Sequence, residues 1–202
     1  MNTNYSEVFS SHFANKSQSD TNAKLTAKMS ARLKNEKVIA MLAASKVDAN
    51  DFRVALYTSR KTVGFVSYAC EIDRDLCKNM HAVFRTLSNF LSARVDFITR
   101  NEIDACINHD VALKSDNANL IYMRDRIKSD AQTQYVIAAM QQLNILKNTA
   151  NKQTFAINET YAFDVMLDAL DIERRDDTEI ESEMLEVEQV ELEEILDSEA
   201  LN

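Results

Sequence analysis

Apolar residues recur at intervals of three and four along most of the chain, which predicts a mainly helical protein. The clearest helix is expected over residues 75–94, where one wide apolar face is formed by Leu76, Met80, Val83, Phe84, Leu87, Phe90 and Leu91. A second long helix is expected over residues 130–147, with Val136, Ile137, Met140, Leu143 and Leu146 facing inward.

The pattern in the first third of the chain is also helical. Residues 22–45 are expected to form one helix, whose apolar stripe is made by Leu25, Met29, Leu33, Val38, Met41 and Leu42. Residues 52–58 and 63–69 are rich in β-branched and aromatic residues, so a hairpin turning at 59–62 is one interpretation. Helix is preferred, because Phe52, Ala55 and Leu56 keep helical spacing.

Residues 1–23 are rich in Ser, Asn and Thr, and we expect a flexible N-terminal arm. Tyr5, Phe9 and Phe13 nevertheless follow one another at intervals of four. This spacing also allows a short helix that packs against a partner.

Two local signals lie in the second half of the chain. Thr99, followed three residues later by Glu102, is a capping box that opens a helix through Ile107. Residues 148–153 are suited to a turn between 145–147 and 154–157, which predicts a short β-hairpin.

The order of these elements resembles that of a winged helix-turn-helix domain over residues 75–160. Residues 97–107 resemble the second helix of that family, residues 133–146 its third, or recognition, helix, and the hairpin its wing. The resemblance implies a mainly α fold with a winged-helix-like core and a small β-hairpin wing. The expected division is a flexible arm (1–23), a basic helical region (24–73), a winged-helix-like domain (74–170) and an acidic C-terminal tail (171–202).

Charge is distributed unevenly along the chain. Residues 171–202 contain fourteen acids against Arg174 and Arg175, a net charge of −12; the whole chain carries −9, which leaves +3 for residues 1–170. Residues 24–61 are the basic centre, with nine bases against three acids. There, Lys24, Lys28 and Arg32 repeat every four residues, and Lys34 and Lys37 are near. This stripe is either a solvated helix face or a phosphate-contacting one.

The resemblance implies a nucleic-acid site with two kinds of contact. Gln134, Gln141 and Gln142 on the third helix are expected to face base edges, because Gln can pair bidentately with adenine. The outer face of that helix has no Lys or Arg before Lys147. Phosphate contacts are therefore expected from Lys24, Lys28, Arg32, Lys34, Lys37, Arg124, Arg126, Lys128, Lys147 and Lys152.

Three roles are open for the acidic tail. It is a solubilising segment, a docking arm for a basic protein partner, or a segment that folds back on Lys24, Lys28 and Arg32 and competes with nucleic acid. The last role, coupled to docking, is preferred because both charge signs occur in one molecule.

Composition argues against several function classes. The chain has no proline and only one glycine, Gly64, so it has no glycine-rich phosphate loop or nucleophile elbow, and turns elsewhere are expected to use Asn, Asp, Ser or Lys. Cys77 with His81 and Cys106 with His109 do not have the spacing of common zinc modules. No enzyme activity, metal or other cofactor is expected. Three cysteines, no signal-like start and no long apolar run favour a cytoplasmic protein without a membrane span.

These features predict a nucleic-acid-binding accessory or regulatory protein of the transcription or replication type. DNA or RNA is its expected partner, and the acidic tail is expected to be autoregulatory or to dock a partner. The alternative is a structural or assembly adaptor, for example a viral one, that binds proteins through the winged-helix-like core and the tail.

Overall fold

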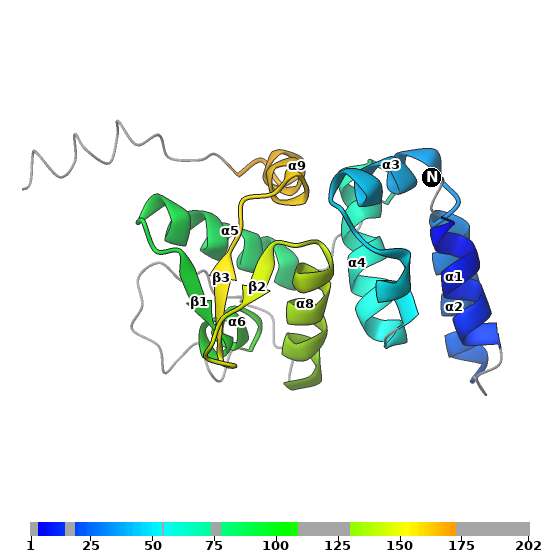
Figure 1. Cartoon of the computed structure of the whole chain (residues 1–202), viewed down its shortest axis with the longest axis horizontal. Helices are drawn as coiled ribbons and strands as arrows, with labels where there is room; N and C mark the ends of the chain where they lie inside the picture. Colours follow the sequence, from blue (N-terminus) through cyan, green and yellow to red (C-terminus); the bar gives the residue numbers. More distant parts are fainter. Residues whose placement is uncertain (1–3, 15–18, 54, 74–77, 109–129, 173–202) are drawn as a thin grey trace, which may run out of the picture.

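The computed structural model describes residues 4–14, 19–53, 55–73, 78–108 and 130–172. Within these ranges the fold is mainly helical, with one small antiparallel sheet (Figure 1). The first part contains α1 (Tyr5–Ala14), α2 (Asp20–Arg32), α3 (Glu36–Ala44), the 3-10 helix η1 (Ala49–Arg53) and α4 (Leu56–Ala69). The second contains α5 (Lys78–Ser92), β1 (Phe97–Thr99), α6 (Arg100–Ile107), α8 (Asp130–Gln142), β2 (Leu146–Asn148), β3 (Thr154–Ile157) and α9 (Tyr161–Ala169).

The expected flexible arm is wrong for residues 5–14, which form α1 and belong to the core. Tyr5, Phe9 and Phe13 are all buried, so the aromatic stripe packs within the chain, against α2 and η1. The Tyr5 hydroxyl donates to the Val47 carbonyl at 3.0 Å, and its ring meets Phe52 edge-on at 5.9 Å. These contacts anchor the helix to residues more than forty positions away.

The single helix expected over residues 22–45 is divided in two. The helix α2 ends at Arg32, and α3 begins at Glu36 after Asn35, whose side chain accepts a 3.0 Å bond from the Lys37 amide. This N-cap satisfies a backbone donor that a continuous helix would not expose. The predicted stripe is still buried from Met29 to Leu42, because the second helix resumes the apolar pattern.

The preference for helix over residues 52–58 and 63–69 is confirmed from Leu56 to Ala69, which form α4 at the centre of the fold, whereas Phe52 belongs to the 3-10 helix η1. The helix α4 contacts α2, α3, α8 and α9, and all of Leu56, Val63, Phe65 and Val66 are buried. Gly64, which we expected at a turn, lies inside this helix.

The second part is organised around a three-stranded sheet of order β1-β3-β2, with both pairs antiparallel. Ile98 pairs with Phe155 and Leu146 with Ile157, and all four are buried. The predicted hairpin is therefore present. The helix before it ends at Gln142 rather than at residue 147, because Leu146 is the first residue of β2.

The predicted capping box is confirmed at the start of α6. The Thr99 hydroxyl accepts from the Glu102 amide at 3.2 Å, and the Glu102 carboxylate accepts from the Thr99 amide at 2.7 Å. The helix α5 also occupies its predicted position within the described range. The ring of Phe84 on α5 stacks on the ring of Phe163 on α9, with centroids 5.9 Å apart. Buried residues of both parts form one continuous core.

Five helices end on a residue with positive φ that is not glycine: Lys46, Glu71, Arg94, Asn144 and Asp171. Each is followed by a β-branched residue whose amide donates back to a carbonyl five positions earlier, at 2.8–3.0 Å. This is the hydrogen bond of a Schellman motif, which usually has glycine at the left-handed position.

Among the described residues, no helix is both long and apolar enough to cross a membrane.

Candidate nucleic-acid interface

Hydrogen bonds fix α6 both to α8 and to the β2–β3 turn. The Thr133 hydroxyl donates to the Asp104 carboxylate, and Arg100 Nη1 donates to Gln134 Oε1 at 2.8 Å. The Arg100 amide also donates to the Gln153 carbonyl at 2.8 Å. Arg100, which we did not predict as a site residue, therefore lies where these three segments meet.

The other end of the exposed face of α8 is joined to β2. Gln141 Nε2 donates to Asn148 Oδ1 at 2.7 Å, and both side chains lie at the surface. We call Arg100, Gln134, Gln141 and Asn148 the α8–hairpin surface. It presents amide and guanidinium groups, which are the groups that read base edges and contact phosphates.

The two hairpin lysines occupy different positions relative to this surface. Lys152 is exposed in the turn between β2 and β3. Lys147 precedes Asn148 in β2, and because strand side chains alternate, it projects from the opposite face of the sheet. It pairs there with Ala156, which also pairs with the exposed Phe97.

The prediction that Gln142 faces outward is wrong. Its Nε2 donates to the Asp51 carbonyl at 2.7 Å, and its Oε1 accepts from the Thr62 hydroxyl. Both ends of the amide thus bond to the protein itself, joining α8 to η1 and α4. Helical periodicity misplaced this side chain because it did not indicate that α4 covers one flank of α8.

That flank also carries an aromatic pair that we did not predict. Tyr57 of α4 stacks on Tyr135 of α8, with ring centroids 5.5 Å apart and planes inclined by 28°. Tyr57 remains 41% exposed. In Figure 1, α4 and α8 lie side by side, with the sheet beyond α8 and α1 and α2 beyond α4.

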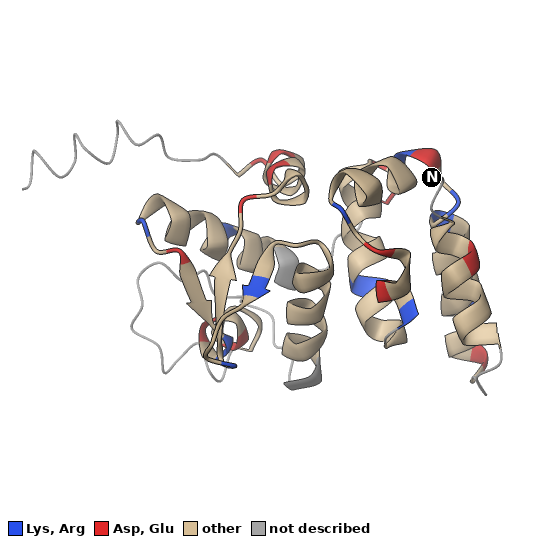
Figure 2. Ribbon diagram, viewed as in Figure 1, with Lys and Arg blue, Asp and Glu red and all other residues tan. Residues whose placement is uncertain are grey.

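The basic residues predicted from the N-terminal region do not join the α8–hairpin surface. Lys24, Lys28, Lys34 and Lys37 are exposed on α2, α3 and their link, whereas Arg32 forms an ion pair with Asp73. Figure 1 places α2 at the end of the molecule opposite the sheet, and Figure 2 shows Lys and Arg dispersed over many elements. Arg124, Arg126, Lys128 and residues 173–202 of the acidic tail lie outside the described residues.

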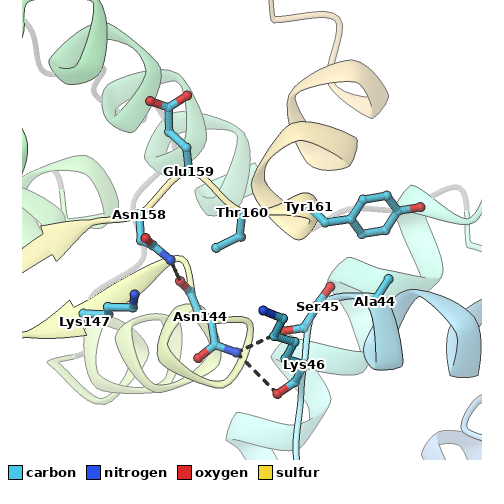
Figure 3. Close-up of a pocket in the computed structure, with 9 residues that line it drawn as sticks. All are labelled: Ala44, Ser45, Lys46, Asn144, Lys147, Asn158, Glu159, Thr160 and Tyr161. Atoms are coloured by element: carbon cyan, nitrogen blue, oxygen red, sulfur yellow. Dashed lines mark hydrogen bonds between the residues drawn. The ribbon is translucent and has the colours of Figure 1, made fainter.

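A pocket of about 500 Å³ lies where three distant segments meet (Figure 3). Asn144 Nδ2 donates to the Ser45 carbonyl at 2.9 Å, and Asn158 Nδ2 donates to the Asn144 carbonyl at 2.8 Å. Thr160 points into the pocket, whereas the Glu159 carboxylate points away. Lys46 and Lys147 supply two ammonium groups to the lining. The two amides join the segments around the pocket, and the two lysines give its lining positive charge.

The structure describes one member of each cysteine–histidine pair, Cys106 and His81. Cys106 is buried, and its Sγ lies 3.2 Å from the Thr86 hydroxyl. His81 is half-buried, and desolvation together with the charge of Arg85 lowers its pKa. Cys77 and His109 lie outside the described residues. Within the described ranges, no three His, Cys, Asp or Glu side chains are grouped to hold a metal ion.

Comparison of the chain with protein-family models, with curated proteins and with solved structures gave no match.

Proposed function

We propose that the protein is a nucleic-acid-binding accessory or regulatory protein, and that α5 to β3 form a winged-helix domain. The observation that carries the proposal is the order of the described elements: α5, β1, α6, α8 and the β2–β3 hairpin, in a sheet of order β1-β3-β2. This is the order expected for a winged helix-turn-helix domain, with α8 as the recognition helix and the hairpin as the wing.

The α8–hairpin surface supplies the contacts. Gln134 and Gln141 lie two helical turns apart on one face of α8, so both can reach bases in one groove. Arg100 orients Gln134, and Lys152 at the hairpin turn contacts phosphate. Lys24 and Lys28, at the far end of the molecule, add phosphate contacts only to a long ligand. The acidic tail competes with the nucleic acid for these cations.

The test is binding of labelled duplex DNA over a range of salt concentrations, with intact and tailless chains. We expect log affinity to fall steeply with log salt, by about one unit of slope for each phosphate contact. Lys152→Ala should lower that slope by about 1. Arg85→Ala, which removes an exposed cation of α5, is the matched control and should leave the slope unchanged.

Base reading is tested with the double variant Gln134→Ala/Gln141→Ala. Loss of one or two amide–base contacts should weaken binding to a preferred sequence by roughly 5- to 150-fold and reduce discrimination between sequences. Unchanged affinity and discrimination in this variant, or no duplex binding by either wild-type chain at low salt, would contradict the proposal.

A second candidate function is that of a structural or assembly adaptor. It is favoured by two exposed apolar side chains next to and on β1, an edge strand: Val95 is 37% exposed and Phe97 is 53% exposed. An edge strand presents unpaired backbone groups that another chain can extend. Under this alternative, salt has little effect on the affinity for the protein partner. The variant Phe97→Ser weakens the affinity for that partner and leaves nucleic-acid binding unchanged.

A further inference from the structure

The only glycine of the chain lies inside a helix rather than at a turn. Gly64 is in the middle of α4, and a Cβ placed there meets no heavy atom within 4 Å in the part of the chain that the structure describes. Glycine destabilises a helix interior relative to alanine, because it loses more conformational freedom on folding. Among the described residues, neither a turn nor packing offsets that loss. A glycine in such a position allows close approach of another molecule to the helix backbone.

The residues that share this face of α4 have a distinct chemistry. Tyr57, Lys61, Gly64 and Tyr68 fall at intervals of four, three and four, so they form one stripe, with Arg60 beside it. The helix contains two bases and no acid over its whole length, Leu56–Ala69. We call these five residues the α4 stripe.

At one end of the stripe, an aromatic platform is already built. Tyr57 is held against Tyr135, so its ring is oriented without help from a ligand. With 41% of its surface exposed, it can still accept a flat group. Arg60 lies one turn further along α4 and is exposed. An oriented aromatic ring next to cations is the arrangement by which proteins hold single-stranded nucleic acid, the ring stacking on bases and the cations tracking phosphates.

We infer that the α4 stripe binds a single strand of nucleic acid, with a base stacked on Tyr57 and the sugar–phosphate backbone passing over Gly64 next to Arg60. The inference rests on the proposed function and deepens it, since Tyr135 places the stripe alongside α8. The occupant is a polyanion because α4 carries only positive charge. A two-fold symmetric dimer through this face would place the positive charges of the two stripes against each other.

The probe is a fluorescently labelled oligo(dT) of about 20 nucleotides, with oligo(rU) to separate DNA from RNA, measured by polarisation with the full chain. We expect Tyr57→Ala to weaken binding by roughly 5- to 100-fold, the loss of about one stacked base. Tyr57→Phe keeps the ring and should bind within about twofold of wild type. Tyr161→Ala is the matched control, since Tyr161 is a 53% exposed tyrosine on α9 and is not part of the stripe.

Gly64 provides a test that separates folding from binding. Gly64→Ala and Gly64→Leu restore helix propensity, and we expect both to raise the thermal midpoint by about 2–4 °C. Gly64→Leu should nevertheless weaken oligo(dT) binding by roughly tenfold, because its side chain occupies the space that the strand backbone takes. A stabilised protein that binds less tightly cannot be explained by misfolding.

Full strand binding by both Tyr57→Ala and Gly64→Leu would overturn the inference. If duplex binding still depends on Gln134 and Gln141 in that case, the proposed function stands without it. If wild type binds neither strand nor duplex, the proposed function itself fails. Sedimentation in which Gly64→Leu turns a dimer into a monomer, with strand binding unchanged, would assign the stripe to a contact between copies and would also overturn the inference.

Discussion

At the residue scale, the chain replaces glycine at helix ends with other residues, and this has a cost. Lys46, Glu71, Arg94, Asn144 and Asp171 all take φ values of 53–60°. For residues with a Cβ, that conformation is unfavourable by roughly 1–2 kcal/mol, and Asn and Asp tolerate it best. The amide of the apolar residue that follows each of them donates to a carbonyl in the last turn of the preceding helix, as in a Schellman motif.

We predict that Glu71→Gly stabilises the protein. Glu71 has φ of 60° and is exposed, so glycine removes strain without removing a buried contact. The free energy of unfolding should rise by about 1 kcal/mol, and the thermal midpoint by about 2–4 °C. Glu71→Ala is the matched control, since it removes the same carboxylate but keeps a Cβ. Equal midpoints for the two variants would show that the left-handed position is not strained.

At the element scale, local signals predicted element type better than element position. The capping box at Thr99 and the hairpin after α8 were predicted because their signals lie within a few residues. The break between α2 and α3 was missed, although Asn35 followed by Glu36 is a helix-start signal. The apolar stripe continues across the break, and that continuity dominated the prediction.

The first helix shows what periodicity cannot supply. The spacing of Tyr5, Phe9 and Phe13 identified a helical face, but not the surface that covers it. That surface is made of α2 and η1, and no local pattern connects residue 5 to residue 47. The candidate site has the same limit: Gln134 and Gln141 were predicted from one helix, whereas Arg100 and Tyr57 come from other elements.

We predict that α1 is required for the stability of the whole protein. Phe9 is fully buried, so Phe9→Ala should cost about 3–5 kcal/mol through lost contacts and the cavity left behind. Ser11→Ala, on the exposed side of the same helix, should change the free energy of unfolding by less than about 0.5 kcal/mol. Urea unfolding measures both. A Phe9→Ala variant as stable as wild type would mean that α1 is not docked in solution.

At the scale of the whole molecule, the basic helical region and the sheet-containing region share one core rather than two. The Gln142 amide spans their boundary, with one end on η1 and the other on α4. This arrangement implies that the two regions unfold together. The sequence did not reveal it, because Gln is mostly exposed in proteins and the helical pattern does not mark one that bonds to neighbouring elements.

We predict that Gln142→Ala destabilises the protein by about 1–3 kcal/mol, because the Asp51 carbonyl and the Thr62 hydroxyl lose their partner. Gln141→Ala, one residue earlier and bonded to an exposed Asn148, is the control and should have little effect. Unfolding followed by far-UV circular dichroism and by tyrosine fluorescence should give the same midpoint in each variant. Separate midpoints would show that the regions unfold independently.

The central place of α4 bears on how the chain is made. Its buried face is covered partly by α2 and α3, which are synthesised before it, and partly by α8 and α9, which are synthesised much later. Until α8 and then α9 have been synthesised, the part of the buried face of α4 that these two helices cover lacks its native partners. Native packing is therefore completed after translation has passed α9, and an early stop codon before that helix leaves a product that is prone to aggregate or to be captured by chaperones.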